Sequence, residues 1–136
     1  MVFTWLLYKT LKFRRQKILY NKRALRVDIA DSVFNKSLGL MYRERIGNDG
    51  MLFISDHDEK YGIWMLNMKF KIDILWLDKS GRVVSVKESA QPCASIFNCD
   101  VYRPDKKARY VLELAAGACK KHGIRKGSKF LLRQVS

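Results

Sequence analysis

The sequence predicts a β-rich α+β domain, with an antiparallel sandwich or barrel-like sheet and two or three short helices. Short apolar runs rich in β-branched residues recur through the middle of the chain, and turn signals separate them. Strands and helices do not alternate, which argues against a doubly wound parallel sheet. The 136 residues, 48% of them hydrophobic, suffice for one domain with a continuous core.

Residues 1–24 are a basic segment that precedes the single β-rich domain, which is predicted over residues 25–136. Apolar side chains recur near helical spacing in this segment, which predicts an amphipathic helix, with a short strand around residues 4–7 as the alternative. The helix would pack on the core of the domain or lie on a membrane surface or nucleic acid. The spaced apolar positions are Phe3, Leu7, Leu11 and Ile18.

Periodicity and turn residues predict the elements of the β-rich domain. Residues 25–29 alternate between apolar and polar side chains, as a half-buried strand does. Asp31 and Ser32 are helix N-caps, and the helix that follows is expected to end near Gly39. The later elements are a turn at 48–50, strands at 51–54, 63–68, 72–77, 83–86, 110–114 and 130–132, and a helix at 115–122.

Two stretches between these elements are predicted to be loops. Residues 56–59 are mostly acidic and follow a short apolar run. Residues 88–103 show no periodicity and contain Cys93 and Cys99, which predicts a long surface loop of the kind that often carries function.

The net charge of +14 is concentrated at the two ends of the chain. Residues 1–30 hold eight basic and one acidic side chain, and residues 103–136 hold ten and two, whereas the middle is nearly neutral. If the ends meet in the fold, they form one basic face that attracts phosphate backbones, anionic lipid headgroups or acidic proteins. A solvated lysine-rich surface without a specific partner is the alternative.

Several features predict a cytoplasmic protein without a metal. No apolar run approaches the roughly 18 residues of a membrane span, and the charges near residues 2–8 follow the apolar part, unlike those of a secretory signal. Cys93, Cys99, Cys119 and His122 are nominally a zinc ligand set, but the Cys93–Cys99 spacing is too long. A Cys93–Cys99 disulfide or two free thiols is favoured, and no cofactor is predicted.

Six segments in order resemble the domain of unknown function 192 family. The resemblance runs from about Leu25 to Leu132 and implies a compact β-sandwich-like domain of archaea and bacteria, with no settled activity, cofactor or substrate. The segments are Gly39-Leu40-Met41-Tyr42-Arg43, Gly50-Met51-Leu52-Phe53, Trp64-Met65-Leu66-Asn67, Ile72-Asp73-Ile74, Val111-Leu112-Glu113-Leu114 with Gly117, and Gly123-Ile124 before Gly127.

This chain departs from the family pattern at three places. Leu66-Asn67-Met68 stands where members have Lys-Asn-Thr, Lys71 replaces a proline, and Ser128 replaces an aspartate. A shared site that used the missing lysine, threonine or aspartate would be altered here. The resemblance therefore limits the carried-over site residues to Arg43, Asn67, Asp73 and Glu113.

The candidate ligand-binding residues are Arg43, Trp64, Asn67, Asp73 and Glu113. Asp73 and Glu113 each lie inside an apolar strand, where a carboxylate either faces solvent or is buried with a partner. They are candidates for acid–base work or for binding a cationic or sugar ligand, or else for structural ion pairs with Arg43 or Arg109. Asn67 could present its amide to a ligand stacked on Trp64, or satisfy backbone groups at a turn.

No nucleophile motif and no phosphate-binding glycine loop occurs, so no catalytic residue is assigned. The leading hypothesis is a non-enzymatic binding or accessory domain with a small-molecule ligand. The first alternative is binding of nucleic acid or an anionic surface by the basic ends, and the second is a small hydrolase or lyase using Asp73 and Glu113. The aromatic residues among the basic ends are Phe13, Tyr20, Tyr102, Tyr110 and Phe130.

Overall fold

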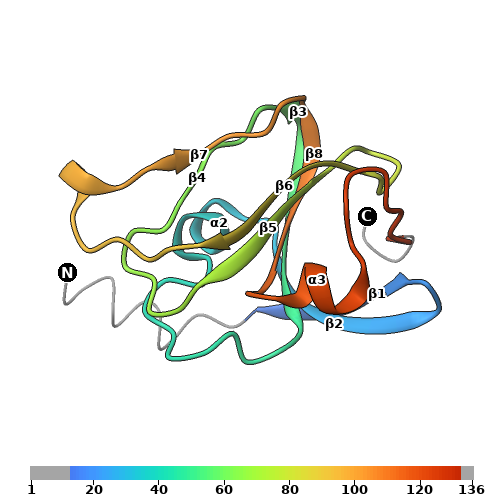
Figure 1. The fold of residues 1–136 in the computed structure, drawn as a ribbon, viewed down its shortest axis with the longest axis horizontal. Coiled ribbons are helices and arrows are strands. Elements are labelled where there is room, and N and C mark those ends of the chain that lie inside the picture. Colours follow the sequence, from blue (N-terminus) through green and yellow to red (C-terminus); the bar gives the residue numbers. More distant parts are fainter. Residues whose placement is uncertain (1–12, 133–136) are drawn as a thin grey trace.

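A computed structural model describes residues 13–132 of the chain (Figure 1). Strands dominate this part, so the predicted β-rich class is confirmed. The elements are β1 (Arg14–Tyr20), β2 (Arg23–Ala30), α2 (Val33–Leu38), β3 (Gly50–Glu59), β4 (Ile63–Trp64), β5 (Ile72–Leu77), β6 (Val83–Ala90), the 3-10 helix η1 (Ile96–Asn98), β7 (Val101–Tyr102), β8 (Ala108–Ala115) and α3 (Ala118–His122).

Six strands form one sheet in the order β1-β2-β3-β8-β5-β6, and β4 pairs with β7 in a separate two-stranded ribbon. All neighbours in the large sheet are antiparallel except β2 and β3, which are parallel. A parallel pair needs a crossover connection, and the segment containing α2 supplies it. The sheet is therefore mixed and open, and not purely antiparallel or closed into a barrel.

Each face of the large sheet carries its own hydrophobic core. All six residues of β5 are buried, and alternation sends Ile74 and Trp76 into one core and Leu75 and Leu77 into the other. The first core, containing Trp76, is covered by the segment after α2 and by the β4–β7 ribbon. The second core, containing Leu75, is covered by α3 and the C-terminal segment.

The first helix and its caps are confirmed as predicted. Ser32 is the N-cap of α2, and its Oγ accepts a hydrogen bond from the Asn35 N–H at 3.1 Å. Gly39 ends the helix with a φ of +50°, a conformation that glycine adopts without steric cost. The strands after the turn at 48–50, at 72–77 and after the turn at 78–81 are confirmed too.

The predicted N-terminal helix is wrong for residues 14–20. These residues form β1, which pairs along its whole length with β2 through a two-residue turn. Asn21 and Lys22 in this turn both have positive φ, as a twisted hairpin requires, and Ile18 and Tyr20 are buried at the period of a strand. Residues 1–12, including the alternative strand at 4–7, lie outside the described residues.

Three further expectations need correction. Residues 56–59 are not a loop, because β3 continues through a register shift to pair Glu59 with Ala108. The surface loop predicted over residues 88–103 is shorter, because β6 continues to Ala90 and β7 begins at Val101, and the loop between them contains η1. Residues 130–132 are not a strand, and only the bridge between Leu19 and Leu131 forms there. Across residues 13–132, no helix is long and apolar enough to cross a membrane.

Candidate functional site

Asp73 and Glu113 lie on neighbouring strands but on opposite faces of the sheet. In the antiparallel register Ile74 faces Glu113 and Asp73 faces Leu114. Residues directly opposite each other share a face, so Glu113 lies with Ile74 in the core under α2 and the ribbon. Asp73 lies with Leu114 on the face covered by α3. The expectation that the two carboxylates act together is therefore wrong, because the sheet separates them.

Asp73 holds the backbone of two other elements. It is fully buried, and its two carboxyl oxygens accept hydrogen bonds from the Ser89 N–H at 2.9 Å and the Cys119 N–H at 3.0 Å. Cys119 lies in the first turn of α3, whose N-cap Gly117 has no side chain to offer. Asp73 thus caps this helix from β5, and the ion pair that was its alternative does not form among the described residues.

Arg43 is engaged in holding the segment after α2 against β2. Its Nη1 donates to Asp28 Oδ2 at 2.9 Å and to the Ile46 carbonyl at 3.1 Å, and its guanidinium lies 5.0 Å from the centre of the Phe13 ring. Asn48 also donates to Asp28, at 2.6 Å. Arg43 therefore has a structural role beside the candidate site. Its positive charge also lowers the pKa of Glu113.

Asn67 stabilises a turn, which was the structural alternative for this residue. It has a φ of +61°, a left-handed conformation that asparagine tolerates better than most residues. Its side-chain Nδ2 donates to the Tyr42 hydroxyl at 3.0 Å, and its backbone carbonyl accepts a hydrogen bond from the Tyr42 N–H at 3.0 Å. The amide is thus already engaged with Tyr42.

Glu113 and Trp64 are the two candidate residues that the fold brings to one pocket. The pocket has a volume of about 180 Å³ and lies between the segment around α2, β3 and the ribbon. Trp64 is 42% exposed, and Lys36 also lines the pocket. The remaining walls are mainly apolar and include Leu38, Leu40, Met41, Phe53, Ile63, Met65 and Met68.

The Glu113 side chain is the buried polar group of this pocket. The residue is 4% exposed, and within residues 13–132 its carboxyl group makes no hydrogen bond or close ion pair. No fully enclosed side-chain oxygen in this part of the chain lacks a partner, so the Glu113 carboxyl oxygens are not wholly enclosed. Burial raises the pKa of Glu113 from 4.5 to about 8, although the Arg43 charge opposes the rise. The group is therefore mainly protonated at neutral pH and offers an O–H donor to whatever enters the pocket.

Local sequence patterns did not indicate the apolar walls of this pocket or the position of Lys36. Met65 and Met68 were assigned to a strand, whereas only Ile63 and Trp64 of that run are in β4. Asn67, a residue type common in turns and here with a φ of +61°, was the available signal that the strand ends before Met68. Methionine side chains adapt readily to varied apolar surfaces, which suits the wall of a binding pocket.

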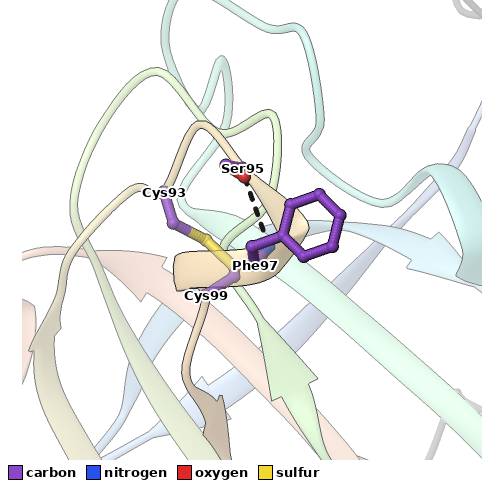
Figure 2. Close-up of a disulfide and its surroundings, with 4 residues drawn as sticks. All are labelled: Cys93, Ser95, Phe97 and Cys99. Carbon is purple, nitrogen blue, oxygen red and sulfur yellow. Dashed lines mark hydrogen bonds between the residues drawn. A yellow bond between two sulfur atoms is a disulfide. The ribbon is translucent and has the colours of Figure 1, made fainter.

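Cys93 and Cys99 form a disulfide, the first of the two predicted alternatives (Figure 2). Their Cα atoms are 5.4 Å apart. The Cys93 N–H donates to the Met65 carbonyl at 3.1 Å, which ties the disulfide loop to the wall of the pocket. Cys119 is buried in the core under α3, and in the described part of the chain no three metal-ligating side chains gather.

The two basic ends meet in the fold. Leu19 and Leu131 exchange backbone hydrogen bonds of 3.1 and 2.9 Å, and the rings of Tyr20 and Phe130 stack at 4.8 Å. These two aromatic rings are buried and are therefore not available to stack on bases. Exposed basic side chains on the adjoining segments are Lys17, Lys22, Arg23, Lys121, Arg125 and Lys129.

Known proteins resemble the chain in sequence and in fold. UPF0127 proteins from Thermococcus gammatolerans and Thermococcus kodakarensis are each 28% identical over 103 and 104 residues, which is 74% and 75% of this chain. The chain spans only 62% and 61% of their lengths. A solved structure titled a putative transcription regulator, from Sinorhizobium meliloti, has a TM-score of 0.78 and 26% identity, covering 88% of this chain and 95% of that one.

A protein of unknown function from Novosphingobium aromaticivorans shares the fold, with a TM-score of 0.73 and 22% identity over 88% of this chain and 85% of that one. The model of the DUF192 family, described as an uncharacterized ACR family, matches residues 16–132. The match includes most of β1 and so begins earlier than the expected Leu25. The chain belongs to the DUF192 family.

Proposed function

We propose that this DUF192 member is a binding domain whose ligand occupies the pocket between Glu113 and Trp64. The observation that carries the proposal is a buried carboxyl group that lines a pocket and has no hydrogen-bond partner within residues 13–132. Buried polar groups are normally hydrogen-bonded, so an unengaged one at a pocket is a natural contact for a ligand.

The walls define the chemistry of this ligand. Its body is apolar and small, because the 180 Å³ pocket lies below the roughly 300–1,000 Å³ typical of sites for drug-sized molecules. A carbonyl or hydroxyl oxygen of the ligand accepts a hydrogen bond from the protonated Glu113 carboxyl group. Lys36 lines the same pocket and favours a ligand that also carries a negative charge.

Binding without turnover is the function that the proposal assigns. Acid–base catalysis generally needs a second positioned group, and Asp73 lies on the opposite face of the sheet. The Asn67 amide is engaged with Tyr42, and Arg43 is engaged with Asp28. Glu113 therefore acts as a recognition group in this proposal.

A fragment screen by NMR tests the proposal. Ligands that perturb the Trp64 indole signal are expected to bind at least tenfold more weakly to Glu113→Leu, which removes the donor but keeps the bulk, while Glu113→Gln retains a donor and most of the affinity. Asp73→Asn is the matched control, because it alters a buried carboxylate on the other face. Equal affinity for wild type and Glu113→Leu would contradict the assignment.

Nucleic-acid binding by the joined basic ends is the second candidate function. Two observations support it: the ends adjoin at Leu19 and Leu131, and the Sinorhizobium meliloti structure is titled a putative transcription regulator. A Lys17→Gln, Arg23→Gln, Lys129→Gln variant is expected to weaken DNA or RNA binding and to reduce the slope of log K against log salt by about 2–3. An unchanged slope would exclude this surface.

We also propose the cytoplasm as the compartment of this protein. The sequence predicts the cytoplasm, whereas a disulfide such as Cys93–Cys99 is typical of oxidising compartments. Rapid acid quenching of cells followed by alkylation decides between the two. Alkylation of Cys93 and Cys99 without prior reduction supports the cytoplasm, and resistance of these two residues to alkylation supports an oxidising compartment.

A further inference from the structure

Two large apolar side chains are displayed at the tip of the disulfide loop. Ile96 is 62% exposed and Phe97 is 94% exposed, and both lie in η1 between the paired cysteines. Figure 2 shows Phe97 between Cys93 and Cys99. The loop lies beyond the β4–β7 ribbon at one end of the long axis of the molecule (Figure 1). A concentrated exposed apolar surface of this kind is characteristic of an interaction site.

The tip is held in this conformation by covalent and hydrogen bonds. The disulfide closes the loop, and the Ser95 Oγ accepts a hydrogen bond from the Phe97 N–H at 3.2 Å. The base of the loop is joined to the ribbon side by the hydrogen bond from Cys93 to Met65. Presenting fixed side chains lowers the entropic cost of binding, so the exposed Phe97 is pre-organised for a partner.

Aromatic and cationic side chains follow the apolar tip along the ribbon. Trp64 pairs in register with Val101, and both are more than 40% exposed. The next residue, Tyr102, has the Lys87 Nζ 5.1 Å from the centre of its ring. The Arg103 guanidinium lies beside the backbone of Gly62, next to the ribbon.

The tip of the loop is uncharged, and charged side chains begin only at the ribbon. Residues 91–99 contain no charged side chain, although 29% of the whole chain is charged. Asp100 is the single acidic residue between this segment and Arg103, and it is exposed. Lys87 and Arg103 are cations on and beside the ribbon, and they provide a local attraction for negatively charged groups behind the uncharged tip.

We infer that the disulfide loop inserts Ile96 and Phe97 into the surface of an anionic lipid bilayer. The apolar tip would enter the hydrocarbon region of the bilayer, and the aromatic side chains of the ribbon would lie at its interface. The cations behind them would face the negatively charged headgroups. A hydrophobic pocket on a protein, or a second copy of this chain, would require the apolar tip but not this graded arrangement. The bilayer is therefore the occupant that the side chains fit.

Vesicle co-sedimentation of the full chain tests the inference. Wild type is expected to bind vesicles of phosphatidylcholine mixed with phosphatidylglycerol, and to bind pure phosphatidylcholine far less. The Ile96→Ser, Phe97→Ser variant is expected to lose affinity on the order of tenfold. Leu131→Ser is the matched control, because Leu131 is 50% exposed in the C-terminal segment and should not affect binding.

Two outcomes would overturn the inference. The first is equal vesicle binding by wild type and the double variant, since the tip would then contribute nothing. The second is a wild-type dimer in analytical ultracentrifugation that the double variant abolishes, combined with no vesicle binding, since the tip would then cover a second copy. A Cys93→Ser, Cys99→Ser variant with intact folding but weaker vesicle binding is expected, because the loop loses its closure.

Discussion

Replacing Glu113 by glutamine is expected to stabilise the protein, and increasingly so as pH rises. The folded protein retains the Glu113 proton up to a pKa of about 8, whereas the unfolded chain releases it near 4.5. Between these values the unfolded state binds fewer protons than the folded state, so the free energy of unfolding falls as pH increases. Glutamine resembles the protonated side chain in shape and does not titrate. The free energy of unfolding of Glu113→Gln therefore does not fall with pH for this reason.

The two pKa values set the size of the effect. Each unit of pKa corresponds to about 1.4 kcal/mol, so the interval from 4.5 to about 8 corresponds to roughly 5 kcal/mol when Glu113 is forced to ionise. At pH 7 roughly 3 kcal/mol of this is already expressed. The effect should be absent near pH 4 and should reach its plateau above pH 8, the folded-state pKa.

Urea denaturation of wild type and Glu113→Gln across this pH range measures the difference in the free energy of unfolding. Subtracting the free energy of unfolding of wild type from that of Glu113→Gln at each pH removes the contribution of all other titrating groups. Asp73→Asn serves as the control. Asp73 accepts two backbone hydrogen bonds, so this substitution should lower the free energy of unfolding of the protein. A difference between wild type and Glu113→Gln that does not change with pH would refute the reasoning that burial governs Glu113.

Three further predictions concern residues that hold the scaffold. Asp73→Ala should lower the free energy of unfolding by roughly 2–4 kcal/mol and accelerate amide exchange in α3, without changing ligand affinity in the pocket; unchanged stability would contradict the helix-capping role. Burial raises the pKa of Cys119 to about 12, so a thiol reagent should find no reactive group in the folded protein, one after unfolding, and three only after the Cys93–Cys99 disulfide is reduced. Arg43→Met should destabilise the fold by roughly 3 kcal/mol in a urea titration, because Asp28 loses its buried cation, and a neutral result would show that Asp28 is adequately held by its other donors.

Periodicity was sufficient for the strands at 25–29 and 72–77 because their pattern is local. The buried run at 72–77 and the alternation at 25–29 each define a strand without reference to the rest of the chain. The cap at Ser32 and the glycine at Gly39 likewise defined α2. The first strand escaped prediction because its apolar residues also fit helical spacing, and only its pairing with β2 distinguishes the two.

The candidate site depended on pairing between distant strands, which the sequence does not encode locally. A shift of one residue between β5 and β8 would have placed Asp73 opposite Glu113 on one face. The observed register separates them by the sheet and brings Glu113 instead to Trp64, Lys36 and the methionine-lined pocket. Neither the spacing of the two carboxylates nor their apolar neighbours could distinguish these arrangements.

The amino-acid sequence was enough to predict the β-rich class, the Ser32 and Gly39 caps of α2, the membership of the DUF192 family and the concentration of charge at the chain ends. These properties depend on composition and on neighbours along the chain. The tertiary structure decided that the basic ends adjoin, that Glu113 is buried at a pocket and that Phe97 is displayed on a closed loop. Each of these depends on strand register and burial, which arise only when distant segments pack together.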